Sequence, residues 1–110
     1  PGSSYAFTHE LILFASKGVP CMKGSNIFRL PGFAGGAKKT NGEMVHPTQK
    51  PVEVIEKLIT DSTQEGDLVL DCFMGSGTTA VASKKLNRNF IGFEIQEKYI
   101  AISESRLKQV

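Results

Sequence analysis

The stretch LVLDCFMGSGTT, residues 68–79, decides the predicted fold. Its first three residues form a short apolar run that is typical of a buried strand, and Asp71 ends that run. The glycines at positions 75 and 77 predict a tight turn, because glycine adopts positive φ without steric cost. Residues 80–86 follow as a short helix. A strand that leads into a glycine-rich turn and a helix is typical of parallel α/β sheets, which bind ligands at the carboxyl ends of their strands.

The flanking residues extend this pattern in both directions. Pro51 suits the first position of a helix with one apolar face over residues 52–59. Residues 90–93 (FIGF) predict a second strand, and residues 96–109 predict a last helix whose core-facing residues are Tyr99, Ile100 and Leu107. The order helix, strand, helix, strand, helix predicts an α/β fold of parallel strands with helical crossovers.

The first 45 residues are less regular. The apolar run LILFA at residues 11–15 predicts a buried strand, whereas the glycine-rich residues 19–45 show no helical or strand period and predict a long loop. The chain therefore divides into a strand-bearing part (1–18), a loop (19–45) and an α/β part (46–110).

Composition excludes several classes of protein. The 110 residues are 40% hydrophobic and 22% charged, which is typical of a soluble globular domain, and the net charge of +2 argues neither for nor against nucleic acid. Two cysteines and two histidines form neither a disulfide framework nor a metal-ligand cluster, so we expect no metal. There is no apolar run long enough for a membrane span and no secretory signal pattern. We expect a cytoplasmic protein.

Glu94 lies at the end of the second predicted strand. An acidic residue at this place can accept hydrogen bonds from both hydroxyls of a ribose, so the turn and Glu94 together predict a pocket for a nucleoside cofactor. The spacing leaves NAD open, because Ala80 is tolerated where the dinucleotide motif has its third glycine. The carboxylate of Asp71 would repel a pyrophosphate and attract an amino group, which favours S-adenosylmethionine.

Two further segments carry candidate binding residues. In HPTQKP (46–51), two prolines fix the backbone before a helix N-terminus, where Thr48 and Lys50 can hold a carboxylate; the alternative is a plain helix start. Lys38 and Lys39 lie in the glycine-rich loop, which departs from the P-loop pattern. They can contact a DNA backbone without reading its sequence, or form a solvated loop tip.

These motifs resemble a known family. HPTQKP (46–51), DCFMGSGTT (71–79) and RNFIGFE (88–94), in this order, resemble the C-terminal half of the amino-group DNA methyltransferases, which methylate adenine N6 or cytosine N4. Residues 10–18 (ELILFASKG) are similar to a strand that the family places before its target-recognition segment. The resemblance is dense over residues 46–107 and patchy over 5–45.

The resemblance implies a partial Rossmann-like, S-adenosylmethionine-dependent methyltransferase fold that acts on double-stranded DNA. Glu94 would bind the ribose of S-adenosylmethionine, and Thr48 and Lys50 its methionine carboxylate. The implied cofactor-binding residues are Thr48, Lys50, Asp71, Phe73, Gly75, Ser76, Gly77, Thr78 and Glu94. Cys72 stands where the family usually has proline, a change expected to loosen the turn without removing the site.

One family motif is absent from the 110 residues. No two of the five prolines are adjacent, so the D/N/S-P-P-Y segment that grips the target amine is missing and no catalytic residue is assigned. We therefore expect the C-terminal part of a longer bacterial or phage enzyme, inactive alone, with adenine N6 favoured over cytosine N4. Exposed sheet edges would favour a homo-oligomer. The alternatives are a non-catalytic module that binds S-adenosylmethionine or DNA, a fragment of a dinucleotide-dependent oxidoreductase, and an α/β domain without a ligand.

Overall fold

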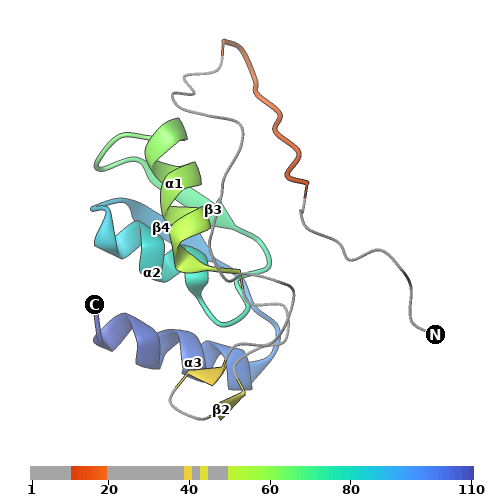
Figure 1. Ribbon diagram of the computed structural model, residues 1–110, viewed down its shortest axis with the longest axis vertical. Coiled ribbons are helices and arrows are strands. Elements are labelled where there is room, and N and C mark those ends of the chain that lie inside the picture. The colour runs from red at the N-terminus through yellow and green to blue at the C-terminus, as the bar shows by residue number, and fades with distance from the viewer. Residues whose placement is uncertain (1–10, 20–38, 41–42, 45–49) are drawn as a thin grey trace, which may run out of the picture.

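The computed structural model describes residues 11–19, 39–40, 43–44 and 50–110 (Figure 1). Its C-terminal part has the predicted order of elements: α1 (Val52–Ser62), β3 (Leu68–Asp71), α2 (Thr78–Lys85), β4 (Asn89–Gly92) and α3 (Glu97–Lys108). Strands β3 and β4 pair in parallel, with Leu68 opposite Asn89 and Asp71 opposite Gly92. The predicted α/β class with parallel strands and a helical crossover is confirmed.

The element boundaries differ from the predictions by one or two residues. Helix α1 begins at Val52, and Pro51 is its N-cap with φ −57° and ψ 136°. Because this ψ is extended, Pro51 lies before the helix and not at its first position. Helix α2 begins at Thr78, directly after the left-handed Gly77 and two residues earlier than predicted.

Helix α2 lies at the centre of the fold. It packs against α1, α3 and β4, and α1 and α3 flank it in Figure 1. Its buried residues are all small or β-branched: Thr78, Ala80, Val81, Ala82 and Ser83. Such short side chains let the neighbouring helices approach closely.

Helix α3 meets this small-residue surface through a serine. The prediction that Ile100 faces the core is wrong, since its side chain is 39% exposed, whereas Ser103 is 8% exposed. Tyr99 and Leu107 are half-buried. Ser103 is the buried residue because it faces Gly77, where there is no room for a larger side chain.

The described helices cover one face of the two-stranded sheet. Val69 and Phe90 are half-buried on that face. On the other face, Leu68 and Leu70 are each 60% exposed and Ile91 is 45% exposed. Parallel sheets are normally buried on both faces, so this face is incompletely covered by the described residues.

The predicted strand at residues 11–15 is wrong for this structure. These residues have no regular secondary structure, and Leu11 and Leu13 are 87% and 98% exposed. The segment runs apart from the helices and strands in Figure 1, so its backbone has no partner strand among the described residues. Within the predicted loop, β1 (Lys39–Thr40) and β2 (Glu43–Met44) form a short antiparallel pair. The rest of residues 20–49 lies outside the described residues.

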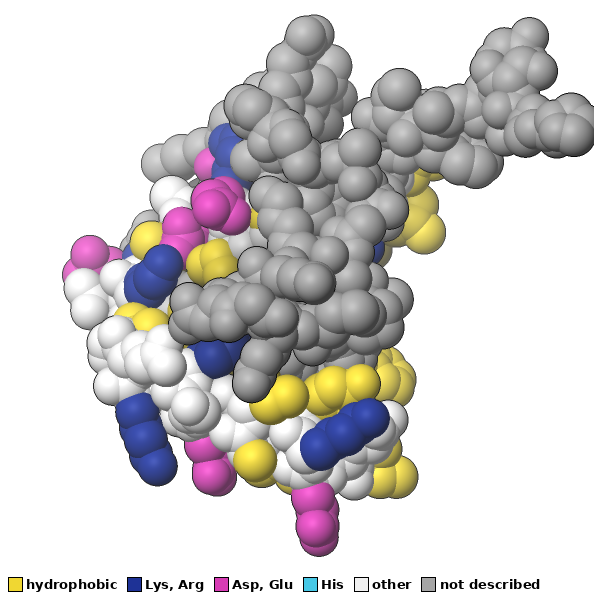
Figure 2. All heavy atoms as spheres, turned by 60° about the horizontal axis from the view of Figure 1, so that its bottom comes forward, with side chains coloured by type: hydrophobic (Ala, Val, Ile, Leu, Met, Phe, Trp, Pro, Cys, Tyr) yellow, Lys and Arg dark blue, Asp and Glu magenta, His cyan; other side chains and the backbone are white. Residues whose placement is uncertain are grey.

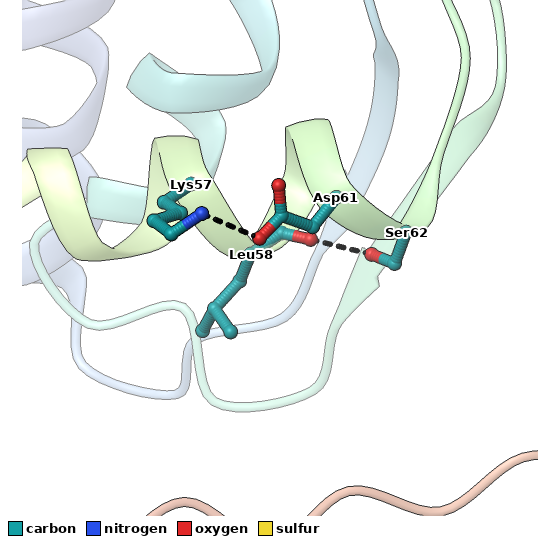
Figure 3. Close-up of polar contacts among 4 residues, drawn as sticks. All are labelled: Lys57, Leu58, Asp61 and Ser62. Atoms are coloured by element: carbon teal, nitrogen blue, oxygen red, sulfur yellow. Dashed lines mark hydrogen bonds and ion pairs between the residues drawn. The ribbon is translucent and has the colours of Figure 1, made fainter. Parts of the chain in front are cut away.

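Polar contacts stabilise the C-terminal half of α1 and join its end to β4. On its surface, Lys57 Nζ lies 2.8 Å from Asp61 Oδ2 one turn later, and the Ser62 hydroxyl donates to the Leu58 carbonyl (Figure 3). After α1, Arg88 donates from Nε to Thr63 Oγ1 at 3.0 Å and from Nη2 to the Thr63 carbonyl at 2.9 Å. Arg88 therefore ties the end of α1 to the start of β4.

Replacing Ser83 with alanine is expected to stabilise the chain by about 0.5–1 kcal/mol. Ser83 is 0% exposed, and among the described residues its hydroxyl oxygen has no hydrogen-bond partner. Removing that oxygen removes the cost of burying an unpaired hydroxyl, and alanine has a higher helix propensity than serine. Urea unfolding followed by circular dichroism measures the change. Ser105→Ala on the exposed side of α3 is the matched control for propensity alone; an equal gain in both variants would contradict the desolvation argument.

Candidate functional site

The parallel pairing brings Asp71 and Glu94 to one edge of the sheet. The ladder continues past the ends of β3 and β4, because the Phe93 amide donates to the Asp71 carbonyl at 3.0 Å and the Met74 amide donates to the Phe93 carbonyl at 2.8 Å. The two carboxylates thus leave adjacent strands side by side, at the edge where parallel sheets bind ligands.

The carboxylate of Glu94 joins the two loops that follow the strands. Its Oε2 accepts a hydrogen bond from the Gly75 amide at 2.8 Å, and its Oε1 accepts one from the Gln96 amide at 2.9 Å. These two contacts use one lone pair on each carboxylate oxygen, and they fix the position of the side chain.

Asp71 is held in a similar way. Its Oδ1 accepts from the Phe73 amide at 3.0 Å, and its Oδ2 accepts from the Thr79 hydroxyl at 2.6 Å. The end of β3 is therefore fastened to the first turn of α2. The negative charge of Asp71 has a defined position beside the turn.

The glycine-rich turn needs glycine at two places. Gly75 has φ 54° and Gly77 has φ 85°, both in the left-handed region that other residues rarely adopt. Gly77 also packs against α3, since a Cβ atom built on it would lie 2.7 Å from the Cβ atom of Ser103. The turn is thus fitted closely onto α3.

These residues surround a cavity of about 380 Å³. Its described lining residues are Lys50, Ile55, Asp71, Phe73, Met74, Gly75, Ser76, Thr78, Thr79 and Glu94. The volume falls in the range of small-molecule sites. Two carboxylates face one ammonium group in this lining, so the cavity favours a ligand with net positive charge.

Seven of the nine predicted cofactor residues line this cavity: Lys50, Asp71, Phe73, Gly75, Ser76, Thr78 and Glu94. Gly77 lies in the same turn, at the start of α2. Thr48 lies outside the described residues, and so does Lys38; Lys39 lies in β1, where only the backbone is described. The geometry groups the residues, and their roles in binding stay predictions.

Three lining residues were not predicted: Ile55, Met74 and Thr79. Thr79 belongs to the DCFMGSGTT motif and follows Asp71 by eight residues. Because these eight residues cover one turn and the start of one helix, the sequence could have predicted the observed hydrogen bond between Thr79 and Asp71. Ile55 belongs to the apolar face of α1, and the sequence does not show whether such a residue lies in the core or lines the cavity. Cys72, where the family usually has proline, is exposed and does not line the cavity.

Charge on the described surface is mixed. Figure 2 shows lysine and arginine side chains interspersed with acidic ones on the face it presents, without one continuous basic patch among the described residues there. In the described part of the chain there is also no cluster of three potential metal ligands, and no helix long and apolar enough to cross a membrane.

A family model described as DNA methylase matches residues 3–105. The chain belongs to the DNA methylase family. The type II methyltransferase M2.MboI of Moraxella bovis is 44% identical over 85 residues, which cover 77% of this chain and 30% of that protein. The family and the methyltransferase resemblance are therefore confirmed.

Solved structures agree with this assignment. The M1.HpyAVI–SAM complex matches with a TM-score of 0.54 and 48% identity, covering 58% of this chain and 33% of that one. PvuII DNA methyltransferase, described as cytosine-N4-specific, matches with a TM-score of 0.55 and 36% identity, covering 60% and 23%. The methyltransferase fold is confirmed, and this chain spans about a third or less of each of these three relatives.

Proposed function

We propose that this chain is the S-adenosylmethionine-binding part of a DNA amino-methyltransferase. The observation that carries the proposal is the cavity at the carboxyl edge of β3 and β4, where, among the described lining residues, the two carboxylates of Asp71 and Glu94 outnumber the ammonium group of Lys50. S-adenosylmethionine carries a sulfonium, an ammonium and one carboxylate, so its net charge complements the lining. A dinucleotide carries a pyrophosphate, which the two carboxylates would repel.

Each group of the cofactor has a candidate partner. We assign the ribose hydroxyls to Glu94, the ammonium group to Asp71 and the methionine carboxylate to Lys50 together with Thr48. Phe73 and the backbone of Gly75, Ser76, Gly77 and Thr78 form the surrounding wall in this proposal. In the turn between β3 and α2, the ligand can approach the backbone at Gly75, because a Cβ atom there would meet nothing within 4 Å.

The proposed reaction of the parent enzyme is methyl transfer to an exocyclic amine of double-stranded DNA, at adenine N6 in preference to cytosine N4. The amine lone pair forms the new N–C bond, the S–C bond breaks with its electrons remaining on sulfur, and the amine loses a proton. A base must leave the stack to reach such a site. The group that positions the base is absent from these 110 residues, so we assign it to another part of the parent enzyme and expect the chain alone to be inactive.

DNA contacts and further packing complete the proposal. We place Lys38 and Lys39 against DNA phosphates, within a target-recognition segment over residues 19–45, between the N-terminal part (1–18) and the cofactor-binding part (46–110). The exposed face of Leu68, Leu70 and Ile91 is assigned to packing against the remainder of the parent enzyme. Self-association of the isolated chain through this face is the alternative, which sedimentation velocity distinguishes.

Titration calorimetry of S-adenosylmethionine into the 110-residue chain tests the cofactor assignment. We expect saturable binding of S-adenosylmethionine and of S-adenosylhomocysteine, and none of NAD. Binding of NAD in place of the methyl donor would overturn the assignment. A folded chain that binds neither would show that this part has no cofactor site of its own.

One observation favours a second candidate function. The missing D/N/S-P-P-Y segment is consistent with a module that binds S-adenosylmethionine without catalysis. To distinguish the two functions, this chain is joined to the N-terminal half of a related methyltransferase, and methylation of DNA by the joined protein is measured. A joined protein that binds the cofactor and forms no methylated base would favour the non-catalytic module.

A further inference from the structure

Helix α3 contacts the glycine-rich turn through two residues one helical turn apart, Ser103 and Arg106. Arg106 Nη1 donates to the Ser76 carbonyl at 2.8 Å and lies 3.2 Å from the Ser76 hydroxyl and 3.3 Å from the Thr78 hydroxyl. Both acceptor residues line the cavity, whereas Arg106 does not. A single charged group outside the cavity therefore contacts two residues of its wall.

These contacts span the point where the chain changes direction. Ser76 and Thr78 lie on either side of Gly77, whose φ is 85°, and the N-cap of α2 has no side-chain hydrogen bond of its own. Hydrogen bonds from a guanidinium are charge-assisted and stronger than those between neutral groups. Arg106 thus fixes the distance between the two residues on either side of this glycine.

Arg106 also acts on the polarity of the wall. A hydroxyl that accepts from a cation is a better donor through its own proton, because hydrogen bonds in a chain polarise one another. Partial burial lowers the pKa of the Arg106 guanidinium below its ordinary value. The group nevertheless keeps its charge at neutral pH, since arginine is not deprotonated in proteins.

We propose that Arg106 is a positioning residue of the cofactor site: it holds the Ser76–Gly77–Thr78 turn and polarises the two hydroxyls of that turn. This inference rests on the proposed function, because it takes the cavity to be the site of S-adenosylmethionine. The residue touches the wall and not the ligand, so its effect reaches the ligand through Ser76 and Thr78.

The structure offers a matched control for a purely structural role. Lys84 Nζ donates to the Leu107 carbonyl at 2.8 Å, which also joins α2 to α3, but at the opposite end of α2 and away from the cavity. Lys84→Gln and Arg106→Gln each remove a link between the two helices. Only Arg106→Gln also removes a contact with the cavity wall.

The test measures S-adenosylmethionine affinity of the 110-residue chain by calorimetry, well below the unfolding temperature of each variant. Arg106→Gln is expected to weaken binding at least about tenfold, Arg106→Lys less, and Lys84→Gln not at all. If Arg106→Gln binds like the unchanged chain, or if Lys84→Gln weakens binding as much, the inference is overturned. If the unchanged chain does not bind, the proposed function itself has failed, which is a different result.

A double-mutant cycle separates positioning from general loosening. Thr78→Val removes the hydroxyl and keeps the shape of the side chain. If Arg106 acts through that hydroxyl, Arg106→Gln costs less affinity in the Thr78→Val background than in the unchanged chain. Strictly additive losses would contradict action through the Thr78 hydroxyl, whereas a smaller loss in the double variant supports it.

Discussion

Replacing Glu94 with alanine is expected to weaken S-adenosylmethionine binding at least about tenfold, or about 1.4 kcal/mol. The change removes the proposed acceptor of the ribose hydroxyls. It also removes the acceptor for the Gly75 and Gln96 amides, which would leave the two loops at the edge of the sheet without their common contact. Calorimetry on the unchanged and variant chains measures the loss.

A ligand analogue distinguishes these two effects of Glu94. S-adenosylmethionine that lacks both ribose hydroxyls should bind the unchanged chain more weakly, and should lose little further affinity in Glu94→Ala. If Glu94→Ala weakens binding of the analogue as much as it weakens binding of the natural cofactor, Glu94 acts by holding the loops and not by contacting the ribose. Glu97→Ala is the matched control, because Glu97 is an exposed acid in the first turn of α3 that does not line the cavity.

Replacing Gly77 with alanine is expected to destabilise the chain by about 3 kcal/mol or more. Two costs add. Gly77 has φ 85°, where a Cβ atom is strained, and that atom would lie 3.0 Å from the backbone Cα of Ser103. Backbone cannot move aside as a flexible side chain can, so α3 must shift away from the turn. Urea unfolding followed by circular dichroism measures the loss.

Gly75→Ala separates the two costs. Gly75 also has positive φ, 54°, but a Cβ atom there would meet nothing within 4 Å. We therefore expect only the conformational cost, about 1–2 kcal/mol. Equal destabilisation by the two substitutions would show that contact with Ser103 contributes nothing. Ser103→Gly in the Gly77→Ala background should recover part of the loss, because it removes the side chain that the new methyl group meets.

The residues of the α/β part were predictable because local rules and packing agree there. The apolar run before Asp71 and the two glycines after it predict a strand and a turn, and both are present. Parallel pairing then places Asp71 and Glu94 together without any information about distant parts of the chain. This agreement is why the sequence alone located most of the described cavity.

Other features depend on contacts that the sequence does not display. The run at residues 11–15 has the composition of a strand, but a strand forms only where a partner backbone is present, and Leu13 is almost fully exposed. Arg106 is one of several basic residues in the last helix, and only the approach of α3 to the turn distinguishes it from Lys108. Ser103 is buried for the same reason, since its small size suits a close contact that no periodicity indicates.

The burial of α2 on several sides constrains which sequences this fold accepts. A helix at the surface has one face on which almost any polar residue is tolerated, whereas α2 contacts α1, β4 and α3. Ala82 is 0% exposed and Ala80 is 1% exposed, so each added methylene at these positions would have to push a neighbouring element away. Mutational tolerance in α2 should therefore be concentrated at Lys84 and Lys85, the two residues of the helix that are exposed to solvent.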